Sequence, residues 1–111
     1  MTSRVPGPNE VQYELLAEPE DEAPDFEDPQ DLAFVREQIR MGNVWGWCRT
    51  EVIAKWTDSE GNEYEGHDYL GGCSYRSRRD FMEPGGYYDD MKSEAYDELV
   101  KQLVKAGFKE I

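Results

Sequence analysis

The sequence predicts a small α+β domain in which an antiparallel sheet is flanked by two helices. Residues 44–70 alternate polar and apolar side chains around a turn, a pattern typical of a β-hairpin. Residues 29–41 and 89–106 instead repeat apolar side chains at helical spacing. The 111 residues are enough for one hydrophobic core but not for two. We therefore expect a single domain at residues 29–111, preceded by an arm at residues 1–28.

The arm is rich in proline and in acidic residues. From residue 1 to residue 31 there are ten acidic residues and one basic residue, Arg4. Few apolar groups are available to offset the entropy cost of ordering this segment, so we expect it to be flexible. Four residues are an exception and can form a short anchor or strand: Val11, Tyr13, Leu15 and Leu16.

The first helix has clear start signals. Asp28 is a good N-cap residue, and Pro29 suits the first helical position because its fixed φ angle is already helical. Leu32, Val35 and Ile39 then recur at helical spacing.

The hairpin is predicted with its register. Its turn is the segment from Asp58 to Asn62, and Gly61 suits the left-handed position that closes a three-residue loop. Pairing Asp58 with Asn62 predicts two favourable cross-strand pairs, Trp56 with Tyr64 and Lys55 with Glu65. Trp45 and Trp47 fall on the more polar face of the first strand, so we expect the arm or a partner to cover them.

The second strand is expected from Glu63 to about Leu70. Gly71 and Gly72 then bend or bulge the chain, and a possible third strand follows at about residues 73–82.

The C-terminal helix is predicted from its apolar stripe. Asp89 and Asp90 favour the start of this helix, because acidic side chains interact well with the helix dipole there. The stripe repeats every four residues: Met91, Ala95, Leu99 and Leu103.

Net charge restricts the partners of this chain. Twelve basic residues stand against 25 acidic residues, a formal net charge of -13. Such a chain is repelled by nucleic acid and by anionic membranes, and it is attracted to basic proteins. The sequence contains no apolar run of membrane-spanning length and no signal-peptide core, and its two cysteines fit a reducing compartment. We therefore expect a cytoplasmic protein.

Chemistry by a metal or a thiol is the alternative that the sequence leaves open. Cys48, His67, Asp68 and Cys73 are all ligand types, but no zinc-binding spacing is present. In the predicted register, Cys48 and Cys73 face opposite sides of the sheet unless the glycine pair shifts the phase. We expect no metal, no cofactor and no catalytic residue. The alternative is a small thiol- or metal-dependent enzyme centred on Cys73 and His67.

The segment from Gly71 to Gly86 is interpreted as a docking loop. It lacks the Lys-Ser/Thr that completes a phosphate-binding loop. Aromatic side chains surround an arginine cluster there, and both types often anchor protein interfaces. Together with the acidic residues, this predicts a set of partner-binding side chains: Glu20, Asp21, Glu22, Asp25, Glu27, Asp28, Trp45, Trp47, Tyr75, Arg76, Phe81, Asp89 and Asp90.

In size, acidity and lack of a catalytic motif, the chain resembles the short accessory proteins of phages and plasmids, among them anti-restriction and anti-CRISPR inhibitors. The resemblance implies a non-enzymatic inhibitor in the host cytoplasm. Such a protein acts as a nucleic-acid mimic: its acidic side chains occupy the basic groove of a defence nuclease complex and exclude DNA or RNA. A scaffold or assembly protein, whose charge serves solubility alone, is a further alternative.

Overall fold

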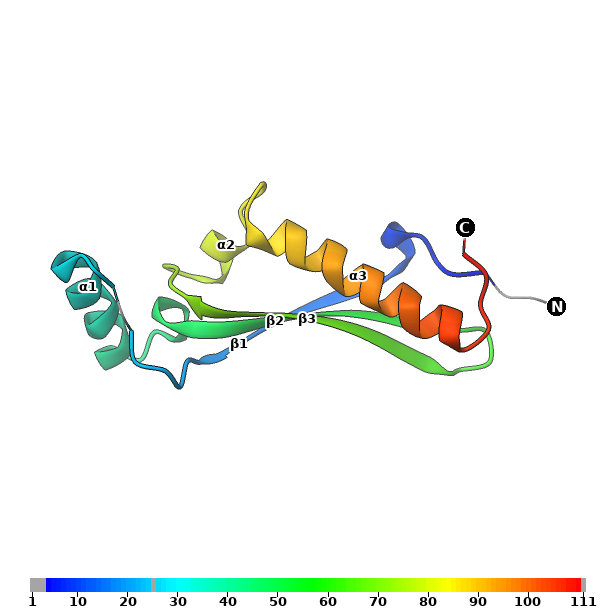
Figure 1. The fold of residues 1–111 in the computed structure, drawn as a ribbon, viewed down its shortest axis with the longest axis horizontal. Helices are drawn as coiled ribbons and strands as arrows, with labels where there is room; N and C mark the ends of the chain where they lie inside the picture. The colour runs from blue at the N-terminus through cyan, green and yellow to red at the C-terminus, as the bar shows by residue number, and fades with distance from the viewer. Residues whose placement is uncertain (1–3, 25, 111) are drawn as a thin grey trace.

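The structure, a computed structural model, describes residues 4–24 and 26–110 of the chain. The described strands form one antiparallel sheet in the order β1-β2-β3, and helix α3 lies across one face of it (Figure 1). This is the α+β class that the sequence predicts. In chain order the elements are η1 (Pro8–Glu10), β1 (Gln12–Pro19), α1 (Pro29–Arg40), η2 (Val44–Gly46), β2 (Cys48–Thr57), β3 (Glu63–Cys73), α2 (Arg78–Phe81) and α3 (Tyr87–Lys105).

The β2–β3 hairpin has the predicted register. The Asp58 carboxylate shapes its turn by accepting hydrogen bonds from the backbone N–H groups of Glu60 and Asn62, each at 2.9 Å. Gly61 adopts a φ of +85°, a conformation that a residue without a Cβ adopts readily. Both expected pairs are present, Trp56 opposite Tyr64 and Lys55 opposite Glu65.

The third strand is not where the sequence analysis places it. Residues 73–82 do not form a strand, because β3 ends at Cys73 and a helical turn, α2, follows. Ser77 caps that turn by accepting a hydrogen bond from the backbone N–H of Asp80 at 3.2 Å. The third strand is β1, which pairs antiparallel with β2 along its whole length.

Strand β1 lies within the segment that we expected to be a flexible arm. Its odd-numbered residues face α3, and the side chain of Leu15 is 2 % exposed in the core. Val11, just before the strand, is also buried in the core. The few apolar residues of the arm are therefore spaced at the period of a strand, and this part of the arm belongs to the sheet.

Helix α1 has the predicted cap and bounds. The Asp28 side chain accepts a hydrogen bond from the backbone N–H of Gln30 at 2.8 Å, and Pro29 occupies the first turn. This helix lies at one end of an elongated molecule that measures 60 × 24 × 21 Å (Figure 1). Val35 is its one buried residue.

Helix α3 supplies a third of the residues of the hydrophobic core. The predicted stripe of Met91, Ala95, Leu99 and Leu103 is buried against the sheet, and each of these residues is at most 3 % exposed. The helix begins at Tyr87, two residues before the predicted start. In the part of the chain that the structure describes, no helix combines the length and the apolar character needed to cross a membrane.

The helix contacts the sheet most closely at Gly66 of β3. A Cβ atom built on Gly66 would lie 2.2 Å from the carbonyl oxygen of Ala95 and 2.3 Å from the backbone nitrogen of Leu99. Both obstacles are backbone atoms of α3, so no side-chain rotation can relieve the clash. Only glycine fits at this crossing.

Replacing Gly66 with alanine should therefore force α3 away from the sheet. We expect the free energy of unfolding to fall by about 3 kcal/mol, the upper end of the range for overpacked cores. Urea denaturation followed by circular dichroism measures this loss. Gly7→Ala is the control, because its new Cβ would lie 3.6 Å from the nearest atom, an ordinary contact. Equal stability of the two variants would show that the helix does not pack as described.

Candidate functional site

The face of the sheet opposite α3 is polar and is termed the open face here. It carries five carboxylates and two basic side chains, so its balance is acidic. Strand alternation assigns thirteen side chains to it: Gln12, Glu14, Leu16 and Glu18 of β1, Arg49, Glu51, Ile53, Lys55 and Thr57 of β2, and Glu63, Glu65, His67 and Tyr69 of β3.

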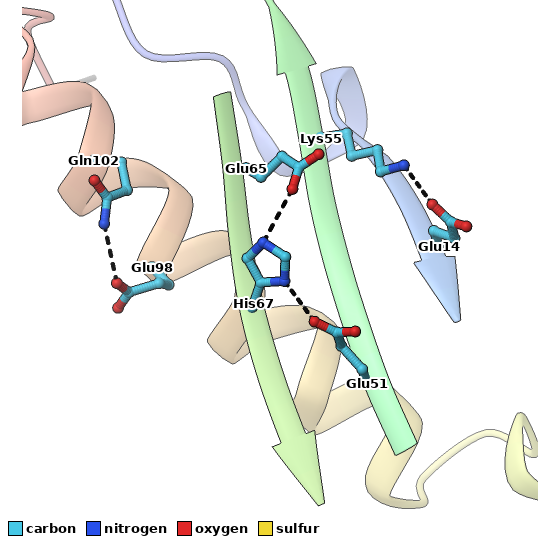
Figure 2. Close-up of polar contacts among 7 residues, drawn as sticks. All are labelled: Glu14, Glu51, Lys55, Glu65, His67, Glu98 and Gln102. Atoms are coloured by element: carbon cyan, nitrogen blue, oxygen red, sulfur yellow. Dashed lines mark hydrogen bonds and ion pairs between the residues drawn. The ribbon is translucent and has the colours of Figure 1, made fainter. Parts of the chain in front are cut away.

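His67 lies between two carboxylates at the centre of the open face. Its Nδ1 atom is 2.6 Å from Glu51 Oε2, and its Nε2 atom is 3.1 Å from Glu65 Oε2 (Figure 2). A neutral imidazole can donate from one nitrogen only, whereas an imidazolium donates from both. The arrangement is therefore fully hydrogen bonded when His67 carries a positive charge.

Polar side chains cover the one buried apolar residue of the open face. Ile53 is 7 % exposed although it lies outside the core cluster on the α3 side. Its neighbours across the strands are Glu14 and His67. The Glu14 carboxylate also pairs with Lys55 and raises the pKa of its ammonium group (Figure 2). Ile53 therefore lies between two side chains that are held by polar contacts, which agrees with its low exposure.

A pocket of about 250 Å³ opens at the α1 end of this face. Tyr69 forms one wall; it is 69 % exposed and stacks on His67 with an interplanar angle of 9°. Leu16 lines the pocket as well, and the carboxylates of Glu18 and Glu51 are at its edge. The Glu51 carboxylate raises the pKa of the Tyr69 hydroxyl. Arg49 also lines the pocket and lies 3.5 Å from Glu18. A lysine or arginine side chain would therefore meet the ring of Tyr69 and the carboxylate of Glu51 there, and it would compete with Arg49 for Glu18.

The described part of the acidic run, residues 18–24 and 26–28, crosses the end of the sheet and is fixed there by specific contacts. Glu20 Oε2 accepts a hydrogen bond of 2.8 Å from the backbone N–H of Gly72, which lowers the pKa of the Glu20 carboxyl. Asp21 lies 3.4 Å from Arg49 of the open face. The run therefore extends the acidic open face around the end of β2 and β3.

The predicted acidic site residues have different roles. Glu20 and Asp21 make the contacts just described, and Asp28 caps α1. Glu22 and Glu27 are exposed. Asp25 lies outside the described residues.

Trp45 and Trp47 precede strand β2, contrary to the predicted strand from residue 44, because the short helix η2 occupies Val44–Gly46. Both side chains are half-buried, and the expected cover by the arm is found for Trp47 alone. Trp47 donates a hydrogen bond of 2.7 Å from its indole nitrogen to the backbone carbonyl of Glu22, and Phe26 packs edge-on against it. Trp45 packs on Phe81, with ring centroids 5.7 Å apart. The arm covers one indole and the domain itself covers the other.

The predicted docking loop contains a core residue. Phe81 is 1 % exposed and is surrounded by the rings of Trp45, Tyr75 and Tyr88, so its assignment as an exposed anchor was wrong. The cause is α2, which turns this side chain inward. Tyr75 is half-buried and packs edge-on against Phe81, with ring centroids 4.8 Å apart. Arg76 is exposed.

Asp89 and Asp90 lie in the first turn of α3, on the other side of the sheet from the open face. The Asp89 carboxylate accepts a hydrogen bond from the backbone N–H of Gly85 at 3.0 Å, and Asp90 is exposed. The predicted site residues therefore do not gather on one surface. Residues that the prediction omitted, Glu51, Glu65, His67 and Tyr69, form the most connected polar cluster of the open face. The hairpin register was the signal that could have identified them.

The two cysteines meet, and His67 lies away from them. Gly72 has a φ of +65° and bulges β3, so Cys73 faces the α3 side and pairs directly with Cys48. This is the phase shift that the sequence analysis left open. His67 is on the open face, which separates it from both thiols. Within residues 4–24 and 26–110, no group of three ligand-type side chains could hold a metal ion.

The chain was compared with protein families, curated proteins and solved structures, and no match was found. Functional inference therefore depends on the geometry of this structure alone.

The contrast between Phe81 and Tyr69 can be measured. Phe81→Ala removes a buried ring and should lower the free energy of unfolding by about 3–5 kcal/mol. Tyr69→Ala removes an exposed ring and should change it by less than about 0.5 kcal/mol. Urea denaturation of both variants tests this. Similar losses in the two variants would contradict the assignment of Phe81 to the core and of Tyr69 to the surface.

Proposed function

We propose that this protein is a non-enzymatic binding protein whose open face and acidic run dock on a basic groove of another protein. The partner class that we propose is a nucleic-acid-binding protein or nuclease, in which lysine and arginine side chains hold phosphate groups. The observation that carries the proposal is the open face: an acidic sheet surface that no helix within the described residues covers, with a pocket beside it that has an aromatic wall and carboxylates.

Charge supports this choice of partner. Several basic side chains already pair with carboxylates of the same chain, including Arg40 with Glu37 and Arg49 with Glu18. Internal pairing leaves the excess of acidic residues unpaired, because 25 acidic residues face only 12 basic ones. Unpaired acids repel one another, and a basic partner relieves that repulsion.

Regular spacing supports the mimicry mechanism. Side chains on one face of a strand are about 7 Å apart along the strand, and adjacent strands are about 4.8 Å apart. Glu63 and Glu65 of β3 are related by the first spacing, and Glu14 and Glu18 of β1 by twice that spacing. Across the second spacing Glu65 lies opposite the cation Lys55, so negative charge repeats along the strands and not across them. Such a row of carboxylates is the feature that we compare with the phosphates of a nucleic-acid backbone.

The pocket supplies specificity that charge alone does not. A lysine or arginine side chain of the partner that enters it contacts the ring of Tyr69 and the carboxylate of Glu51, and it competes with Arg49 for the carboxylate of Glu18. Aromatic and charged groups together bind a cation more tightly than an exposed carboxylate does. Glu94 and Asp97 of α3 are exposed and do not line this pocket, so they serve as a matched control.

Binding to an arginine-rich peptide at physiological ionic strength tests the proposal. The double variant Glu18→Gln, Glu51→Gln should raise the dissociation constant about tenfold, equivalent to about 1.4 kcal/mol. The control Glu94→Gln, Asp97→Asn removes the same charge from exposed positions of α3 and should raise it by about twofold. Isothermal titration calorimetry measures both, and amide shifts of the labelled protein should map the peptide to the open face.

Equal effects of the two double variants would contradict the proposal. They would show that the peptide responds to net charge alone, which is the behaviour of a scaffold whose acidity serves solubility. Amide shifts that map to α1 or to the outer side of α3 would contradict it as well.

A further inference from the structure

Two thiols meet in the core at the bulged end of the sheet. Cys48 and Cys73 are partners in the β2–β3 ladder, both are reduced, and their exposures are 0 % and 4 %. We propose that they are a site of reversible oxidation, in which Cys73 reacts first with a low-molecular-weight disulfide and Cys48 then closes an intramolecular disulfide. This inference does not depend on the proposed binding function.

The register places the two residues within bonding reach. Directly opposed residues of an antiparallel ladder have Cα atoms about 4.5–5.5 Å apart. Disulfides join Cα atoms that are about 4.4–6.8 Å apart. Both side chains point to the α3 side, because Thr50, two residues from Cys48, lies 3.7 Å from both Cys73 Sγ and Met91 Sδ. A disulfide therefore needs no slip of the strands.

Access to solvent distinguishes the two thiols. Cys73 lines a surface pocket of about 390 Å³, whose other walls include Phe26, Tyr75 and Tyr87. Cys48 is fully buried and does not line this pocket. A small reagent that enters the pocket reaches Cys73 alone, so Cys73 is the attacking thiol and Cys48 the resolving thiol.

The acidities of the two thiols also favour Cys73 as the attacking thiol and Cys48 as the resolving thiol. Interaction with the neighbouring Cys48 thiol lowers the pKa of Cys73 to about 7, and the Thr50 hydroxyl, 3.7 Å from Cys73 Sγ, assists. In its protonated form the Cys73 thiol donates to the backbone carbonyl of Leu70 at 3.4 Å. The interaction between the two thiols, together with burial, raises the pKa of Cys48. Because the thiolate is the nucleophile, Cys73 reacts at a pH at which Cys48 is still protonated.

The reaction balances with glutathione disulfide as the oxidant. The Cys73 thiolate attacks one sulfur of the reagent; a mixed disulfide forms, and one glutathione thiolate leaves with the electron pair of the broken S–S bond. That thiolate takes up the proton of Cys48. The Cys48 sulfur then attacks Cys73 Sγ, which releases the second glutathione. Two protein thiols lose two electrons and two protons, and the reagent becomes two thiols.

Oxidation would fasten β2 to β3 where the acidic run is attached. Cys73 follows Gly72, whose backbone N–H donates to Glu20. A bond between the strands fixes the bulge that presents this N–H. Oxidation would therefore stiffen the attachment of the acidic run without changing its charge.

Mass spectrometry of the folded protein after incubation with glutathione disulfide tests the inference. The wild type should lose two hydrogen atoms and retain no glutathione, and peptide mapping should join Cys48 to Cys73. Cys48→Ser should instead accumulate glutathione on Cys73. Cys73→Ser should react at least about tenfold more slowly, because its remaining thiol is buried and has a raised pKa.

Three results would overturn the proposal: wild-type protein that stays fully reduced, wild-type protein that keeps glutathione on Cys73, or serine variants that react at equal rates. Circular dichroism of each variant establishes that it is folded. Should a serine variant not fold, the rates at which iodoacetamide labels Cys73 and Cys48 in the wild type still test which thiol reacts first. Cys73 should be labelled first, and its rate should level off near pH 7, below the value of about 8.5 for an ordinary thiol. Labelling of Cys48 first would contradict the assigned order.

Discussion

The close contact between α3 and β3 at Gly66 determines how this small protein is built. Because the helix backbone touches the strand backbone there, Ala95 and Leu99 reach the sheet and are completely buried. A chain of 111 residues has little apolar surface left after one helix has covered one face of its sheet. The other face must then be stable in water, and its polar composition follows from that requirement.

Paired charged side chains make the open face of the sheet stable in water, and they also form the proposed binding surface. Ile53 is buried there between Glu14 and His67, its neighbours on the two adjacent strands. Such exposed pairs contribute little to stability one by one, so their main effect is to fix side-chain positions and exclude water from Ile53. Fixed carboxylates lose less conformational entropy when a partner binds, which makes an ordered acidic surface a better binding site than a flexible acidic tail.

Local signals in the sequence were sufficient for the hairpin and for both long helices. Asp58 determined the turn, and the register then placed every residue of β2 and β3 up to the bulge. A short strand around Val11 to Leu16 was one of the two forms expected for this part of the arm, but its place in the sheet was not predicted. Its partner lies beyond α1 in the chain, and alternation alone does not say which strand pairs with which. Phe81 was misplaced for a related reason: one Ser77 cap creates a turn too short to show helical periodicity. The cluster around His67 could also have been predicted. It follows from the register once the side chains of β2 and β3 that share the open face are listed as neighbours.

The glycine pair at the end of β3 connects these features. By adding a residue to one strand, the bulge turns Cys73 from the open face to the core and leaves the N–H of Gly72 free to bind Glu20. One local irregularity thus brings the two thiols together and attaches the acidic run to the sheet. A strand of regular geometry would place Cys73 beside Tyr69 on the open face, away from Cys48. The chemistry of the thiols and the position of the acidic surface therefore depend on the same two glycines, although each can be tested without the other.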